Sequence, residues 1–256
     1  MKIDRFLREN FSLEGRKGIV TGSSRGLGEA IGKQLANSGA KVYAISRSGK
    51  FTDESNYLKE NIVHVKIDLL DTKKLTDFVN RIGPGGIDFI VNNAGITKKM
   101  NAQDFDRQSY YDIQKLNIDS VFFLCQLAFP YLKKSRHIGR IINISSMAAS
   151  LGFSKVTPYC ISKSALNGLT RGLAVEWAKD NILVNSISPG WFLTELVEST
   201  LNEDRKIKIL NRMPLHRFGN PKEIAVLVQF LISPNATYIT GQDFAVDGGA
   251  LAYGIK

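Results

Sequence analysis

Tyr159 and Lys163 lie four residues apart, so in a helix they share one face. A tyrosine hydroxyl ordinarily has a pKa near 10. A nearby ammonium group favours the phenolate, and a shift of about 2–3 units corresponds to roughly 3–4 kcal/mol. Ser146 follows the apolar run 140–145, at the end of a strand where ligand sites of parallel sheets collect. The three side chains predict proton transfer at a C–O group, with Ser146 bound to its oxygen. The alternative is a strand-end serine and a half-buried helical tyrosine.

A glycine-rich loop, TGSSRGLG over 21–28, directly follows the first apolar run. Its Gly22, Gly26 and Gly28 allow a tight turn and a close approach of the backbone to a ligand. The helix that begins there offers free N–H groups to a pyrophosphate. The loop therefore predicts a dinucleotide site, although a helix start that merely needs small residues is the alternative.

The choice of dinucleotide depends on the end of the second strand. It reads Ala44-Ile45-Ser46-Arg47, without the carboxylate that holds the ribose of NAD. Arg47, together with Arg25 of the glycine loop, could instead bind a 2′-phosphate. We expect NADP(H) as the preferred cofactor and keep NAD(H) as the second choice. Both arginines could also be ordinary solvated side chains.

The elements that must position these residues follow from the apolar pattern. Short runs rich in Val and Ile predict strands at 18–21, 41–46, 62–67, 87–92, 140–145, 182–188 and 244–246. Amphipathic stretches predict helices at 26–38, 72–82, 104–115, 119–135, 158–178 and 221–232. This alternation predicts an α/β fold: a Rossmann-type doubly wound parallel sheet of about seven strands with helices on both faces. We expect one domain over 1–256.

Two segments depart from that rhythm. The stretch 48–61, between the second and third strands, is too short for a full helix and its connections. Residues 194–215 follow a Pro-Gly turn, and we expect them to form a substrate lid with one or two short helices. Residues 201–222 carry six basic and two acidic side chains, so this region is cationic.

Composition limits the classes of function. The 256 residues include 34 Lys and Arg against 24 Asp and Glu, a net charge of +10 that suits nucleic acid, a membrane surface or an anionic ligand. No apolar run approaches the roughly 20 residues of a membrane span, and the N-terminus lacks the apolar core of a signal peptide. Two cysteines and three histidines show no zinc spacing, so we expect a cytoplasmic protein without a metal.

The only dense basic run, 133–140, lies at a helix end, where cations are favoured anyway. We therefore expect an anionic small-molecule substrate, no nucleic acid and no membrane; a non-catalytic NADP-binding sensor or a nucleic-acid-binding protein is the alternative.

From about Leu13 to Gly249 the chain resembles the short-chain dehydrogenase/reductase superfamily. The motifs that carry the resemblance are TGSSRGLG, Asp68-Leu69, Asn92-Asn93-Ala94-Gly95, Asn117, Ser146, Tyr159-Cys-Ile-Ser-Lys163, Pro189-Gly190 with Thr194, and Val246-Asp247-Gly248-Gly249. Each is weak alone, and their order and spacing make the joint match specific.

The resemblance implies hydride transfer between a nicotinamide and a secondary alcohol or ketone. Tyr159 would be the general acid/base, Ser146 would polarise the carbonyl, and Lys163 would bind the nicotinamide ribose and lower the pKa of the tyrosine. Asn117 would hold a water that links Lys163 to solvent. We expect the cofactor to be bound by Gly22, Ser24, Arg25, Gly26, Leu27, Gly28, Ser46, Arg47, Asp68, Leu69, Asn93, Ala94, Gly95, Tyr159, Lys163, Pro189, Gly190, Phe192 and Thr194. The family also implies a homotetramer.

Within the superfamily the chain resembles gluconate 5-dehydrogenase and 2-deoxygluconate 3-dehydrogenase. The resemblance rests on 11–15, the basic pair Lys98-Lys99, Ser146-Met147, Pro189-Gly190-Trp191 and Arg217-Phe218-Gly219. Cations near the site suit an anionic substrate. We expect a sugar acid such as gluconate or ketogluconate, contacted by Lys98, Lys99, Met147 and Trp191. A 3-oxoacyl-[acyl-carrier-protein] reductase shares every catalytic motif and is the alternative, since the same cations could bind an acidic carrier protein.

Overall fold

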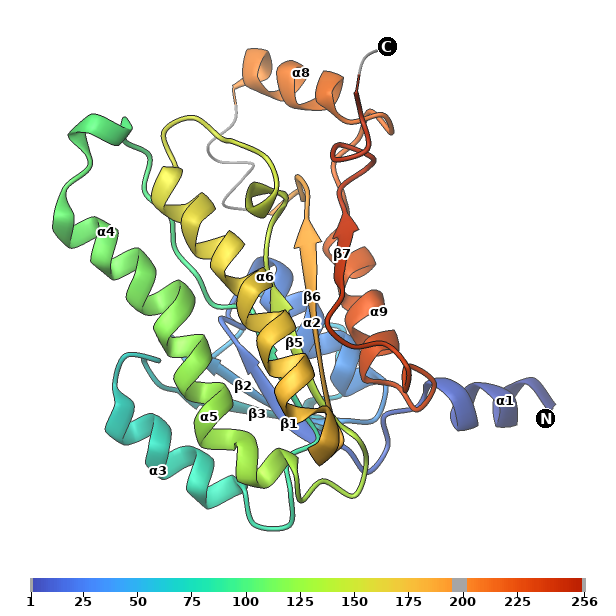
Figure 1. Ribbon diagram of the computed structural model, residues 1–256. Coiled ribbons are helices and arrows are strands. Elements are labelled where there is room, and N and C mark those ends of the chain that lie inside the picture. Colours follow the sequence, from blue (N-terminus) through green and yellow to red (C-terminus); the bar gives the residue numbers. More distant parts are fainter. Residues whose placement is uncertain (1, 195–201, 255–256) are drawn as a thin grey trace.

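A seven-stranded, wholly parallel sheet forms the centre of the molecule (Figure 1). The computed structural model describes residues 2–194 and 202–254. The strands are β1 (Lys17–Thr21), β2 (Lys41–Ser46), β3 (Ile62–Lys66), β4 (Phe89–Asn92), β5 (Gly139–Ile144), β6 (Ile182–Pro189) and β7 (Asp243–Val246). Their order, β3-β2-β1-β4-β5-β6-β7, is doubly wound, which confirms the predicted fold class.

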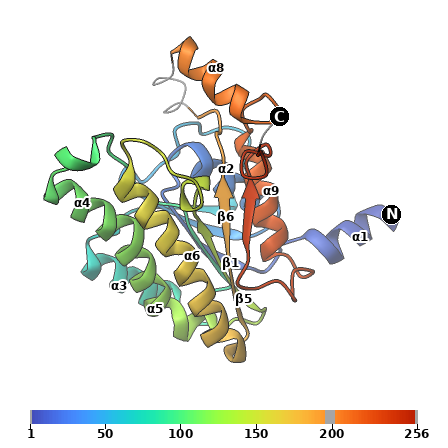
Figure 2. The ribbon, with the colours of Figure 1, turned by 45° about the horizontal axis from the view of Figure 1, so that its top comes forward.

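Helices cover both faces of the sheet (Figures 1 and 2). One face carries α2 (Gly26–Asn37) and α9 (Pro221–Ile232), and the other carries α3 (Thr72–Ile82), α4 (Arg107–Gln114), α5 (Ser120–Leu132) and α6 (Thr157–Trp177). All six lie where the apolar pattern predicts helices. Most of their ends differ from the predicted ends by no more than three residues.

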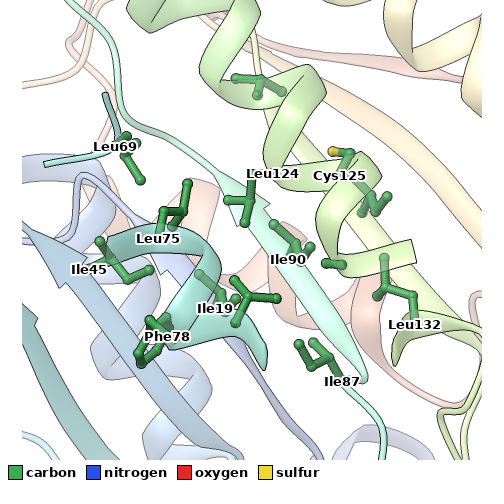
Figure 3. Packing of buried hydrophobic residues seen from close by; sticks show 14 of the residues in the cluster. Ile19, Ile45, Leu69, Leu75, Phe78, Ile87, Ile90, Leu124, Cys125 and Leu132 are labelled. Atoms are coloured by element: carbon green, nitrogen blue, oxygen red, sulfur yellow. The ribbon is translucent and has the colours of Figure 1, made fainter. Parts of the chain in front are cut away.

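Each face of the sheet has its own apolar core. Figure 3 shows the core beneath α3 and α5, where Ile45 and Ile90 of the sheet meet Leu75, Phe78 and Leu124. A second cluster lies between the sheet and the helices α2 and α9. Strands buried on both faces explain why their sequences are nearly continuous in Val and Ile.

The predicted helices 104–115 and 119–135 are joined in the structure. A π-helical turn, Lys115–Asp119, connects α4 directly to α5, and Asn117 lies in its middle, fully buried. One extra residue per turn locally widens a helix, and such turns occur frequently at functional sites.

Within residues 2–194 and 202–254, two further helices lie outside the alternating pattern. The first, α1 (Lys2–Phe11), was not predicted; it projects from the sheet (Figure 1), held by bonds from Asn235 Nδ2 to Asn10 O (2.9 Å) and Gln229 Nε2 to Phe11 O (3.1 Å). The second, α8 (Glu203–Arg212), lies within the expected lid. Part of that lid, 195–201, lies outside the described residues. Segment 48–61 contains only a short 3₁₀ turn, Lys59–Asn61, as its length predicts.

Candidate active site

The glycine loop lies where β1 adjoins both β2 and β4, the position at which a doubly wound sheet binds its ligand. Gly22 has a φ of +63°, which a glycine adopts at little cost. A Cβ on Gly28 would lie 2.3 Å from Gly22 O and 2.4 Å from Asn93 Nδ2. The loop can therefore form only with glycine at positions 22 and 28, and it exposes the N-terminus of α2.

Asn93 fastens the neighbouring loop to the glycine loop. Its Nδ2 donates to Thr21 O and Gly22 O, both at 3.0 Å, and its N–H donates to Thr21 Oγ1 at 3.0 Å. The N–H of Ala94 donates to the same hydroxyl at 3.1 Å. Residues 93–95 and the glycine loop thus form one rigid rim at the carboxyl ends of β1 and β4.

The two arginines predicted to select NADP lie on neighbouring segments. Ser23 N–H donates to Ile45 O of β2 (3.2 Å), and Thr52 N–H donates to Ser24 O (2.8 Å), so the end of β2 adjoins the glycine loop. Arg25 and Arg47 are exposed there, and neither forms an ion pair with a carboxylate within 2–194 and 202–254. The Ser46 hydroxyl accepts from Gly49 N–H at 3.0 Å and so shapes the turn that carries Arg47.

Other predicted cofactor residues lie at the same edge, but some of their side chains have structural partners. Leu69 is buried in the core (Figure 3), and Phe192 is buried against Gly219. Asp68 is exposed and accepts from Leu70 N–H at 3.0 Å. Thr194 adjoins the glycine loop, because a Cβ on Gly26 would lie 3.3 Å from its Cγ2. For Leu69 and Phe192, the main chain is the part that faces away from the core.

Leu27 packs partly buried against the cluster between the sheet and the helices α2 and α9, and Pro189 ends β6. Gly190 lies against Asp247, since a Cβ there would be 2.6 Å from Asp247 Cα. Its N–H donates to Val246 O at 2.9 Å. These residues complete the edge of the sheet on the β6–β7 side.

Ser146, Tyr159 and Lys163 converge beside β5. Ser146 follows the strand, its hydroxyl accepts from Ala148 N–H at 3.1 Å, and its side chain lies near enough to Tyr159 to affect the pKa of that hydroxyl. The Lys163 ammonium lies 5.6 Å from the centre of the Tyr159 ring and donates to Ile144 O at 2.7 Å. The helix that carries both begins with Pro158 in its first turn, a favoured position for proline. The predicted triad is therefore assembled from the end of a strand and the first turns of one helix.

Burial dominates the electrostatics of this triad. It lowers the pKa of Lys163 to about 8. It also raises the pKa of Tyr159, and the nearby side chain of Ser146 partly opposes that rise. The lowering of the tyrosine pKa by Lys163 that the resemblance implies is not seen here, because Lys163 is not among the groups that shift this pKa and its ammonium donates to Ile144 O.

Asn117 joins the triad to the 93–95 rim. Its Oδ1 accepts from Ile96 N–H (2.9 Å), and its Nδ2 donates to Ile96 O and Ser162 Oγ, both at 3.0 Å. A Cβ on Gly95 would lie 3.2 Å from Asn117 Oδ1 and 3.6 Å from Lys163 Nζ, so the amide and the ammonium adjoin. Ser162 was not predicted from the sequence, where its place directly before Lys163 was the available signal.

The predicted substrate residues separate into two groups. Met147 is buried with Ile209 of α8, and Trp191 packs at the margin of that cluster. Lys98 is bound to Asp106 Oδ2 at 2.7 Å. Burial and, secondly, the charge of Arg205 lower the pKa of Lys99. Arg205 was not singled out from the sequence, where only the total charge of its region gave a signal.

Two hollows in the surface are lined by other residues than the triad. One, of about 280 Å³, is lined by residues that include Phe105, Tyr111 and Ile161, and the other, of about 420 Å³, by Leu193 and Phe218 among others. Neither contains the triad, so the site is assigned from its chemistry. Within the described ranges, no cluster of three or more His, Cys, Asp or Glu could hold a metal ion, and no helix is long and apolar enough to span a membrane.

Comparison with protein families gives a match over residues 22–250 to the family described as enoyl-(acyl carrier protein) reductase. Three relatives have different names at nearly equal similarity. A tropinone reductase homologue of Arabidopsis thaliana is 37% identical, covering 97% of both chains. The 2-dehydro-3-deoxy-D-gluconate 5-dehydrogenase of Escherichia coli is 36% identical over 94% of this chain and 98% of its own. The 3-oxoacyl-[acyl-carrier-protein] reductase of Vibrio cholerae is 36% identical over 93% and 98%.

Among solved structures, a gluconate 5-dehydrogenase of Burkholderia cenocepacia superposes with a TM-score of 0.87 at 28% identity. The match covers 96% of this chain and 99% of that one. That structure holds NADP and tartrate. The sequence identities to these relatives show a common fold, but they are too similar to distinguish between the substrates. Particular side chains of the site must therefore distinguish them.

Proposed function

Because this chain belongs to the short-chain dehydrogenase/reductase family, we propose that Ser146, Tyr159 and Lys163 make it an NADP(H)-dependent oxidoreductase of a sugar acid. The substrate carbon would bear a secondary alcohol or a ketone, as in gluconate or a ketogluconate. The convergence of the three side chains beside β5 is the observation that carries this proposal.

The residues present fit a dinucleotide. Gly22 and Gly28 leave no room for side chains, so that the backbone and the N-terminus of α2 can approach a pyrophosphate. Arg25 and Arg47 suit a 2′-phosphate, which the acid of an NAD site would repel. The NADP held by the gluconate 5-dehydrogenase relative supports the same choice. When bound, the nicotinamide supplies the hydride acceptor or donor.

The side chains of this chain would handle the proton. In reduction, Ser146 donates a hydrogen bond to the substrate carbonyl oxygen, and Tyr159 gives its proton to that oxygen as the charge develops. In oxidation, Tyr159 accepts the proton from the alcohol. Lys163 lies beside Tyr159 with Asn117 and Ser162 behind it, so these groups would position the tyrosine and pass its proton onward.

The sugar acid is favoured over an acyl thioester by the cations beside the triad. Arg205 lies on α8, whose Ile209 is buried with Met147, the residue after the catalytic serine, and the charge of Arg205 lowers the pKa of Lys99. The gluconate relative holds tartrate, a small dicarboxylate, together with NADP. A 3-oxoacyl-[acyl-carrier-protein] reductase is the second candidate, because a relative with that name is equally similar.

A substrate screen tests the proposal. Absorbance of NADPH would be followed with gluconate, 5-ketogluconate and 2-deoxygluconate against acetoacetyl thioesters, with Tyr159→Phe as the inactive control. We expect turnover of sugar acids, and loss of about a thousandfold or more in kcat for the variant. Turnover of thioesters alone would transfer the function to the second candidate. An active Tyr159→Phe variant would refute the mechanism.

The proposal also covers the oligomeric state and the location of the protein. We expect a homotetramer in the cytoplasm. Its support is an exposed stripe of small and apolar residues on α6, at positions 161, 164, 168, 172 and 175, with exposed Phe122 and Phe123 on the adjoining α5. Small residues let helices from two copies approach closely, and contiguous apolar surface marks an interface.

A further inference from the structure

The two lysines that follow residues 93–95 have different environments. Lys98 Nζ donates to Asp106 Oδ2 and to Ser109 Oγ, each at 2.7 Å. Asp106 is the N-cap of α4, where its Oδ1 accepts from Ser109 N–H at 2.8 Å. Lys98 therefore fastens its loop to the start of α4, and its charge is already paired.

Lys99 extends from a loop that is held on both sides. Ile96 is bonded to the side chain of Asn117 through both its N–H and its carbonyl, and Met100 N–H donates to Lys155 O at 2.9 Å. Lys99 itself is exposed and forms no ion pair with any carboxylate of the described chain. Its backbone is thus fixed while its ammonium remains available.

Arg205 approaches from the other wall. Asn202 caps α8 through a bond from Arg205 N–H to Asn202 Oδ1 (3.0 Å). The guanidinium carbon lies 5.8 Å from the centre of the Trp191 ring, a cation–π contact. One turn later, Ile209 is buried against Met147. Arg205 is therefore anchored near the catalytic serine, and it too lacks an ion pair within 2–194 and 202–254.

The charges of Lys99 and Arg205 act on each other. After burial, the charge of Arg205 is the second cause that lowers the pKa of Lys99. Neither cation forms an ion pair with a carboxylate of the described residues, so their mutual repulsion raises the free energy of the site. An anion bound by both would remove that penalty, whereas an uncharged ligand would not.

We propose that Lys99 and Arg205 bind the carboxylate of the substrate from two sides, while Trp191 holds the guanidinium in place. The proposal rests on the proposed function in one respect, namely that Ser146 and Tyr159 act on the alcohol or ketone of the same molecule. It assigns the acid recognition to one lysine of the basic pair and to a side chain of α8.

Kinetics of Lys99→Met and Arg205→Met test this assignment. Lys206→Met is the matched control. Lys206 is the neighbouring cation of α8, and its charge is already paired, with Nζ lying 3.6 Å from Glu203 Oε1. The substrates are gluconate and glucitol, which differ in that one end is a carboxylate or a hydroxymethyl group. We expect KM for gluconate to rise about tenfold or more in each test variant, with a smaller change in kcat. Lys206→Met should leave KM unchanged, and turnover of glucitol should not respond to any of the three.

A binding measurement keeps the test independent of turnover. Tartrate would be titrated calorimetrically into the enzyme loaded with NADP+. We expect its affinity to fall about tenfold or more in Lys99→Met and in Arg205→Met, and to be largely restored in Arg205→Lys. Absence of tartrate binding to the unmodified enzyme, or an equal loss in Lys206→Met, would overturn the assignment.

The two arms separate this inference from the proposed function. If gluconate is not turned over but tartrate binding depends on Lys99 and Arg205, the anion site stands and the proposed substrate fails. If gluconate is turned over with unchanged KM in both variants, the proposed function stands and the anion site is wrong.

Discussion

Lys163 shows at the scale of one residue how burial prepares a side chain for its role. Its ammonium is enclosed beneath Tyr159, with Ile144 O as its hydrogen-bond acceptor. Removing a charged group from water favours its neutral form, which is why its pKa falls to about 8. A lysine of this kind can lose and regain a proton near neutral pH, as a proton path beside the tyrosine requires.

The same burial predicts a pH dependence of stability. Because the pKa of Lys163 is about 8 in the folded chain and near 10.4 in the unfolded chain, the folded state is destabilised below pH 8. That penalty disappears as the pH rises from about 8 to 10.5. The free energy of unfolding of the unmodified protein, minus that of Lys163→Met, should therefore rise over this interval by on the order of 3 kcal/mol. Denaturant unfolding at each pH measures it, and a flat difference would show that the ammonium is not destabilised.

Arg47 is the residue whose replacement should separate the two cofactors. In Arg47→Ala we expect the Kd for NADPH to rise about tenfold or more, because a charge-assisted contact to the 2′-phosphate is lost. The Kd for NADH should stay the same. Lys41→Ala, at the exposed opposite end of β2, is the control. Equal weakening of both cofactors by Arg47→Ala would contradict a role in phosphate recognition.

At the scale of the element, two of the three glycines of α2, Gly28 and Gly32, have different surroundings. A Cβ on Gly28 would overlap Gly22 O and Asn93 Nδ2, whereas a Cβ on Gly32 would meet only the tip of the Phe51 ring at 3.2 Å. Gly28→Ala should lower stability by about 1–3 kcal/mol and weaken cofactor binding, since the rim must move. Gly32→Ala should stay within about 1 kcal/mol, because alanine favours the helix. Thermal unfolding with and without NADPH compares them, and similar behaviour of the two variants would refute the close packing.

The strands and the triad could be predicted because their signals are local. Strands buried in a parallel sheet have continuous apolar sequences, and Tyr159 and Lys163 lie on the same face of any helix that contains them. The π turn could not be predicted in this way, because the bonds of Asn117 reach Ile96 and Ser162, which lie far away in the chain. The sequence could likewise not show that Lys98 is paired while Lys99 is not, because Lys98 is bound to Asp106, the N-cap of α4. Arg205 was missed because its role depends on where α8 packs.

At the scale of the whole molecule, the exposed stripe on α6 predicts association. Val175, the most exposed apolar side chain of that stripe at 83%, should be enclosed between copies. Val175→Arg should therefore shift light scattering from about four chain masses to a smaller species, because a charge would be buried without a partner. Leu70→Arg, at a half-exposed position in the turn after β3, should leave the mass unchanged. A monomeric unmodified protein would contradict the proposed tetramer.

The π turn at Lys115–Asp119 also affects how changes in chain length would be tolerated. Removing one residue from this turn would restore a regular helix and rotate everything on one side of the deletion by about 100° relative to the other. Asn117 could then no longer face Lys163 while α5 kept its buried side toward the sheet. Deletions are ordinarily tolerated at loop tips. Here the deletion of a single residue in the middle of a helix would move the Asn117 amide away from Lys163, although every catalytic residue would still be present.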